Sequence, residues 1–91
     1  MIRKLDVIVA GGGGQTRLDI SGDVLRVAVL PPQGATYDIE FVTLEDYGAW
    51  GTVGLSGRAT VDIKDYFDEI MLVTISNASL DGEYGIRIWL R

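Results

Sequence analysis

Hydrophobic and polar residues alternate along most of this chain, which predicts β-strands rather than helices. In TYDIEFVTL, residues 36–44, the side chains of Tyr37, Ile39 and Phe41 share one face and acidic residues occupy the other. An alternation of period 2 is typical of a strand with one buried face. The same pattern, or an apolar run of strand length, occurs in residues 5–10, 16–21, 24–30, 58–64, 69–76 and 83–91. No long stretch repeats with the helical period of 3.6 residues.

Turn-forming residues separate these segments. Gly22 and Asp23 predict a tight turn, and Pro31 ends the strand that follows because proline cannot donate to a ladder. Asp81-Gly82 predicts a hairpin into the last strand. The segment DYFD, residues 65–68, predicts either one helical turn or a loop. Strands at this spacing predict an antiparallel β-sandwich or jelly roll of about seven to eight strands, in a single domain of residues 1–91.

Four consecutive glycines follow the first strand, in VIVAGGGGQTRL, residues 7–18. A dinucleotide fingerprint needs a third glycine three positions after the second, but Thr16 or Arg17 stands there. A P-loop needs a lysine followed by serine or threonine, and the next segment alternates as a strand. We therefore expect no nucleotide site. Residues 1–14 predict an N-terminal strand or arm and a glycine-rich linker.

Large side chains in a second glycine-rich stretch suggest a contact surface. The stretch YGAWGTVGLSG, residues 47–57, has glycine at every third position. It predicts either a plain connection or a contact loop. Trp89 lies opposite the apolar face of the last strand, which fits a partner surface, packing under a loop, or a carbohydrate platform. The predicted protein-interface residues are Tyr47, Trp50, Val53, Leu55 and Trp89.

Composition excludes most catalytic chemistry. The chain has no histidine and no cysteine, so the usual general base, the usual triads and thiolate metal sites are absent. Four clustered acids could bind calcium or form a glycosidase pair, but we expect solvated side chains there. These acids are Asp62, Asp65, Asp68 and Glu69. We predict no catalytic, cofactor-binding or metal-binding residues, and a protein that is not an enzyme.

Charge and the N-terminal segment narrow the range of partners. The eight basic and 13 acidic residues give a net charge of −5 without a basic stripe, which argues against nucleic-acid binding. The first apolar run is interrupted by Asp6 and ends at Ala10, so it is too short and too polar for a signal peptide or a membrane span. We therefore expect synthesis in the cytoplasm without a signal peptide, and no membrane partner.

The chain from Ala35 to the end resembles the small jelly-roll domains of the pre-peptidase C-terminal type, which occur at the C-termini of secreted peptidases. The resemblance rests on TYDIEFVTLED, on TVDI, and on IMLVTISNASLDGEYGIRIWL, whose end matches the pattern G-x-Y-x-(I/V)-x-(I/V). It implies no catalytic residues. It implies structural roles for Tyr37, Ile39, Gly82, Tyr84, Ile86 and Ile88.

The size and the all-β pattern also resemble, by analogy of architecture, small tailed-phage virion proteins that decorate or cement capsids. We therefore predict a non-catalytic structural or assembly protein, located in the virion and made in the host cytoplasm. Its predicted partners are other virion proteins, such as a major capsid protein, and further copies of itself in a homo-oligomer. The alternative is a glycan-binding or accessory β-sandwich module.

Overall fold

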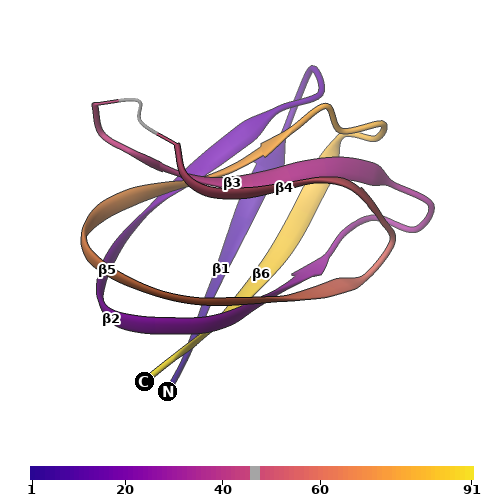
Figure 1. Ribbon diagram of the computed structural model, residues 1–91. Coiled ribbons are helices and arrows are strands. Elements are labelled where there is room, and N and C mark those ends of the chain that lie inside the picture. The colour runs from indigo at the N-terminus through magenta and orange to yellow at the C-terminus, as the bar shows by residue number, and fades with distance from the viewer. Residues whose placement is uncertain (46–47) are drawn as a thin grey trace.

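The computed structural model describes residues 1–45 and 48–91, and these residues contain six strands and no helix (Figure 1). The strands form one antiparallel sheet in the order β1-β6-β2-β5-β3-β4. Their bounds are β1 (Ile2–Val9), β2 (Gly14–Leu30), β3 (Thr36–Thr43), β4 (Gly48–Ser56), β5 (Ala59–Ser76) and β6 (Gly82–Leu90). The all-β, antiparallel prediction is confirmed. The predicted number of seven to eight strands is wrong for the part described.

Two predicted breaks lie inside long strands. Gly22 and Asp23, predicted to form a tight turn, lie within β2 opposite Phe67 and Tyr66 of β5. Residues 65–68, predicted as a helical turn or loop, belong to β5. Both predictions are wrong because the ladder between β2 and β5 continues through these polar residues while the strand pair curves (Figure 1). Hydrogen bonds to the neighbouring strand therefore outweigh the local turn preference.

Residues 48–56, predicted as part of a glycine-rich connection, form strand β4. Among the described strands β4 pairs with β3, and the register shifts between Tyr37 and Ile39 and again between Phe41 and Val42. Gly54 lies at the first shift with a φ of 71°, a backbone conformation that favours glycine. The glycines thus fit a bulged edge strand, a form that discourages unwanted strand pairing.

The four-glycine run forms a tight corner between β1 and β2. Gly11 and Gly12 have φ values of 66° and 86°, and the Ala10 N–H donates to the Gly13 carbonyl over 3.1 Å. Positive φ at both central residues is typical of a type I′ hairpin turn. A Cβ on Gly14 would overlap the carbonyl oxygen of Ile8. The run therefore supplies both the turn and a close backbone approach, and β1 continues as an edge strand paired with β6.

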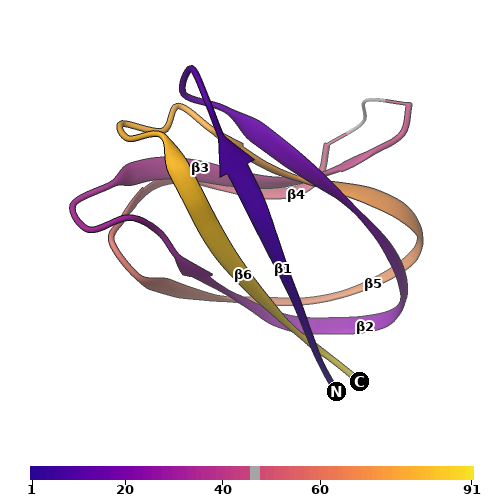
Figure 2. The ribbon, with the colours of Figure 1, turned by 180° about the vertical axis from the view of Figure 1, so that it is seen from behind.

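The curved sheet encloses one hydrophobic core. In the view of Figure 2, β1 and β6 lie in front and β3 and β4 lie behind. Tyr37 and Tyr84 meet edge to face with ring centres 5.5 Å apart, and their hydroxyls donate to the carbonyls of Gly57 and Leu80, each over 2.7 Å. Burial, and secondarily Tyr84, raise the pKa of Tyr37 to about 12. The core residues are Val7, Val9, Leu18, Ile20, Val24, Val27, Val29, Ala35, Tyr37, Ile39, Phe41, Phe67, Met71, Val73, Ile75, Tyr84, Ile86, Ile88 and Leu90.

Candidate functional site

Trp89 stands at the centre of a row of side chains on the outer face of the sheet. It alternates with buried neighbours along β6 and lies directly opposite Ile2 of β1 and Arg26 of β2. The Arg26 guanidinium carbon lies 5.8 Å from the centre of the indole, within the range of a cation–π contact. Asp62 of β5 continues the row and pairs with Arg26 over 3.7 Å. Trp89 itself is half-buried, and Ile2 is 47% exposed.

Two cations lie next to this row. Lys4 of β1 and Arg87 of β6 are directly opposite each other, each two residues along its strand from the row and on the same face. Within residues 1–45 and 48–91, neither side chain forms an ion pair, although Arg87 donates to the carbonyl of Ile86 over 3.3 Å. Like charges on directly opposite positions destabilise a sheet. We call the surface formed by Ile2, Lys4, Arg26, Arg87 and Trp89 the Trp89 face.

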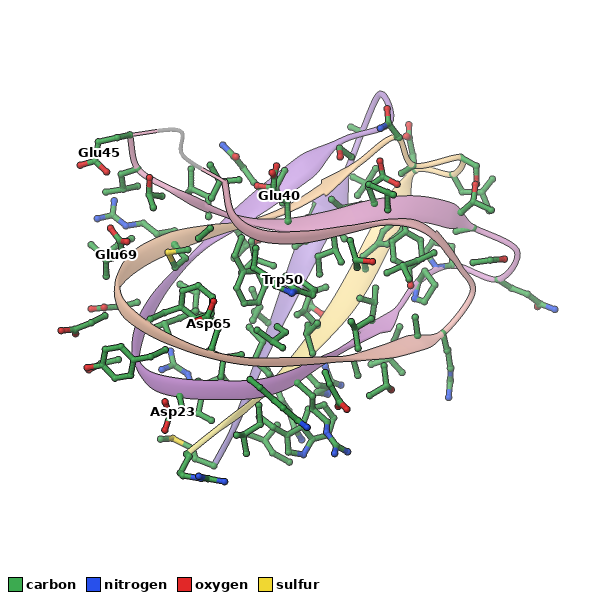
Figure 3. All side chains as sticks on the ribbon, in the orientation of Figure 1. Asp23, Glu40, Glu45, Trp50, Asp65 and Glu69 are labelled. Atoms are coloured by element: carbon green, nitrogen blue, oxygen red, sulfur yellow. The ribbon has the colours of Figure 1, made fainter. Side chains whose placement is uncertain are left out.

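The predicted interface residues of β4 divide between its two sides. Trp50 packs edge-on against Phe41 with ring centres 5.3 Å apart, and Leu55, opposite Tyr37, also packs against the core. Val53, in contrast, is 77% exposed. Figure 3 shows the Trp50 side chain inside the curve of the sheet.

The structure therefore does not bring the predicted set together on one surface. Trp50 and Leu55 contact the core, while Val53 and Trp89 lie on outer faces of strands that are not neighbours in the sheet. Tyr47 lies outside the described residues. A role for these side chains in an interface stays a prediction, and the structure makes Trp89 and Val53 the more accessible members in the described part.

Two carboxylates of β3 lie over the glycines of β4. Glu40 projects away from the core in Figure 3, and its Oε2 lies 2.9 Å from the place where a Cβ on Gly48 would stand. Asp38 accepts hydrogen bonds from Asn77 Nδ2 over 2.7 Å and from the Gly54 N–H over 2.9 Å. These two bonds, the one from Asn77 first, lower the pKa of Asp38. The carboxylate is therefore held in its charged form.

A shallow depression of about 330 Å³ lies beside these carboxylates, on the outer face of β3 and β4. The exposed Val53 forms part of its lining, together with Thr52 of β4 and Ser76 of β5. We call the surface formed by Asp38, Glu40, Gly51, Val53 and Ser76 the acidic ledge. Figures 1 and 2 show β1 and β6 on one side of the molecule and β3 and β4 on the other. The Trp89 face and the acidic ledge, which belong to the outer faces of these strands, therefore lie on opposite sides of the molecule.

The acids that are clustered in the sequence lie along β5, where Asp62 and Asp68 contact different partners. Asp62 pairs with Arg26, and Asp68 accepts a hydrogen bond from the Ser21 hydroxyl over 3.2 Å. Asp65 and Glu69 are exposed. Outside residues 46 and 47, no group of three or more histidine, cysteine, aspartate or glutamate side chains is placed to hold a metal ion.

The predicted list of interface residues left out the charged members of both surfaces. The predicted set did not include Lys4, Arg26 and Arg87, or the carboxylates Asp38 and Glu40. The alternation of Arg87 and Trp89 on one strand face was visible in the sequence, but the register that places Lys4 and Arg26 beside them was not. A glycine at every third position opposite an acidic strand was the available signal for the acidic ledge.

No protein-family model matches this sequence, and no curated protein matches it. Among the residues that the structure describes, no helix is long and apolar enough to cross a membrane.

Proposed function

We propose that this protein is a non-catalytic assembly protein that binds another protein molecule through the Trp89 face. The observation that carries the proposal is the row in which Trp89 lies between exposed Ile2 and Arg26. Tryptophan and arginine are among the side chains enriched at the energetic centres of protein interfaces. A half-exposed indole next to an exposed isoleucine gives that surface an apolar centre, and charged groups surround it.

Lys4 and Arg87, which form no ion pair within residues 1–45 and 48–91, support a protein partner with acidic groups. Lys4 and Arg87 face each other at a cost to the free protein, and an acidic surface would relieve their repulsion. Arg26 already has a carboxylate partner in Asp62, so it can orient the indole while the other two cations contact the partner.

We place this assembly role in a phage virion, as a component such as a capsid decoration or cement protein. The supporting feature is a short all-β chain that lacks histidine and cysteine and has shallow depressions in its described part. The curvature of the six-stranded sheet around one core favours classification as a jelly roll, and the likeness to pre-peptidase C-terminal domains belongs to the same proposal. This support is an analogy of architecture.

The alternative of a glycan-binding module receives less support. A sugar platform needs an open aromatic face, but Trp50 packs against Phe41 and a guanidinium lies over the Trp89 ring. The same row therefore favours a protein partner over a sugar.

Replacement of Trp89 by alanine tests the proposed function. We expect the wild-type protein to associate as its concentration rises, and Trp89→Ala to weaken this association by about 2–4 kcal/mol while its circular dichroism stays that of a folded β-protein. The matched control is Tyr66→Ala, because Tyr66 is 60% exposed on β5 and lies outside the Trp89 face.

Sedimentation velocity over a concentration series measures the association. A wild-type chain that stays monomeric, or a Trp89→Ala variant that assembles as well as the control, would contradict the proposal. Quenching of tryptophan fluorescence by oligosaccharides, in a monomer, would favour the glycan-binding alternative instead.

A further inference from the structure

We propose that copies of this protein stack head to tail, with the Trp89 face of one copy on the acidic ledge of the next. This inference rests on the proposed function and names its partner as a second copy of the same chain. The contact is between unlike surfaces, so each copy uses both of its outer faces.

Charge complementarity favours this partner. In the described residues, the outer faces of β2, β3 and β5 near the ledge carry four acids and one cation, Arg17. These acids are Asp19, Asp38, Glu40 and Asp68. The Trp89 face brings Lys4 and Arg87, neither of which has an ion-pair partner within the described ranges. Stacking would therefore place unpaired cations against a surface with excess negative charge.

The apolar parts of the two surfaces also correspond. Val53 is 77% exposed at the depression of about 330 Å³, and Ile2 is 47% exposed beside Trp89. Exposed apolar side chains on a small protein gain free energy when an interface covers them. Val53 and Trp89 were both predicted from the sequence as interface residues although they lie on opposite sides of the molecule. Head-to-tail contact is the arrangement that uses both in one interface.

A symmetric contact between two Trp89 faces is less favourable. Lys4 and Arg87 lie directly opposite each other in the sheet, so a two-fold contact centred on them would bring four cations together. Unlike surfaces avoid this repulsion. Because the strands that carry the two surfaces lie on opposite sides of the molecule, the contact can repeat, and the association is expected to be open-ended rather than limited to a dimer.

Charge reversal on each surface tests the stacking. Arg87→Glu damages the Trp89 face, and Glu40→Arg damages the acidic ledge. We expect each variant alone to associate about tenfold or more weakly than wild type. A mixture of the two variants should associate again, because each retains one intact surface that fits the intact surface of the other. Wild-type association should also weaken as salt concentration rises.

Two controls make the comparison specific. Arg58→Glu and Glu69→Arg change the net charge by the same amounts at exposed positions outside both surfaces, and both are expected to associate like wild type. Circular dichroism checks that each variant is folded. Should Glu40→Arg fail to fold, Glu40→Gln removes the charge with a side chain of the same size and is expected to weaken association in the same direction.

The outcomes separate this inference from the proposed function. Loss of association in Arg87→Glu with no effect of Glu40→Arg would overturn head-to-tail stacking and leave the Trp89 face as the binding surface. Failure of the mixture to associate would also overturn stacking. A wild-type chain that remains monomeric at low salt would overturn both proposals.

Discussion

Replacing Gly14 by alanine tests the glycine corner that joins β1 to β2. An alanine Cβ there would overlap the carbonyl oxygen of Ile8 and would lie 3.0 Å from its carbonyl carbon and 3.2 Å from Cγ1 of Val7. Two of these three atoms belong to the backbone, which cannot turn aside as a flexible side chain can. The substitution must therefore move β1 away from the start of β2.

The size of the effect follows from what β1 buries. Val7 and Val9 are 0% and 2% exposed, and full burial of a side chain of this kind is worth about 1.5–3 kcal/mol. A shift of β1 would lose part of that burial and strain the corner, so we expect Gly14→Ala to lower the free energy of unfolding by about 1–3 kcal/mol. In a domain of this size, that corresponds to a decrease in Tm of roughly 5–20 °C.

Gly13→Ala is the matched control. Gly13 does not have a positive φ, and the nearest atom to its added Cβ would be the Ile75 carbonyl oxygen at 3.5 Å, an ordinary contact. We expect Gly13→Ala to change the free energy of unfolding by about 0.5 kcal/mol or less. Alanine lowers the conformational entropy of the unfolded chain, and this offsets part of any loss of stability in the folded state. Urea unfolding followed by circular dichroism measures both variants. Equal stability of the two variants would refute the close approach of Gly14 to Ile8.

Three further predictions concern the core and the acidic ledge. Trp50→Ala should lower the free energy of unfolding in urea by about 1–3 kcal/mol, because the indole packs against Phe41; an unchanged value would contradict this packing. Burial raises the pKa of Tyr37 from 10 to about 12, so the contribution of the neutral side chain to stability is present below pH 10 and is lost as the pH rises towards 12. Tyr37→Phe should show a smaller loss of stability at alkaline pH, measured by urea unfolding at a series of pH values. The pKa of Asp38 is lowered, so the contribution of this side chain to stability depends on pH in the opposite direction. The contribution is present above pH 3.8 and is lost as the pH falls further. Asp38→Asn should therefore lose less stability in acid than the wild type does. An acid titration with the same slope in both proteins would count against the Asn77 and Gly54 hydrogen bonds.

The alternating pattern of this sequence predicts the class of fold because a strand with one buried face must repeat every two residues. Tyr37, Ile39 and Phe41 were predicted to share one face, and all three are buried. The number of strands could not be predicted in the same way. Gly22 and Asp23 have the composition of a turn, yet they remain in β2 because β5 pairs with them through the curve. Whether a local turn or a long ladder forms depends on a partner strand that lies far away in the sequence.

The candidate site was only partly predictable for the same reason. Trp89 was identified because it stands opposite the apolar face of its own strand, which is a local property. Arg26 and Lys4 join it through registers between β6 and its two neighbours, and such registers depend on the whole sheet. Trp50 was predicted as an interface residue because its glycine-rich surroundings are typical of a loop. As a strand residue opposite Phe41, it contacts the core, and its role in an interface stays a prediction.

The most direct test of the proposed binding surface is the fluorescence of Trp89 during association. The variant Trp50→Phe leaves Trp89 as the sole tryptophan in the chain and keeps an aromatic ring against Phe41. We predict that its emission maximum moves to shorter wavelength as protein concentration rises, in step with the increase in sedimentation coefficient, because assembly covers the half-buried indole. Association with no change in the emission of Trp89 would contradict the assignment of the Trp89 face as the binding surface.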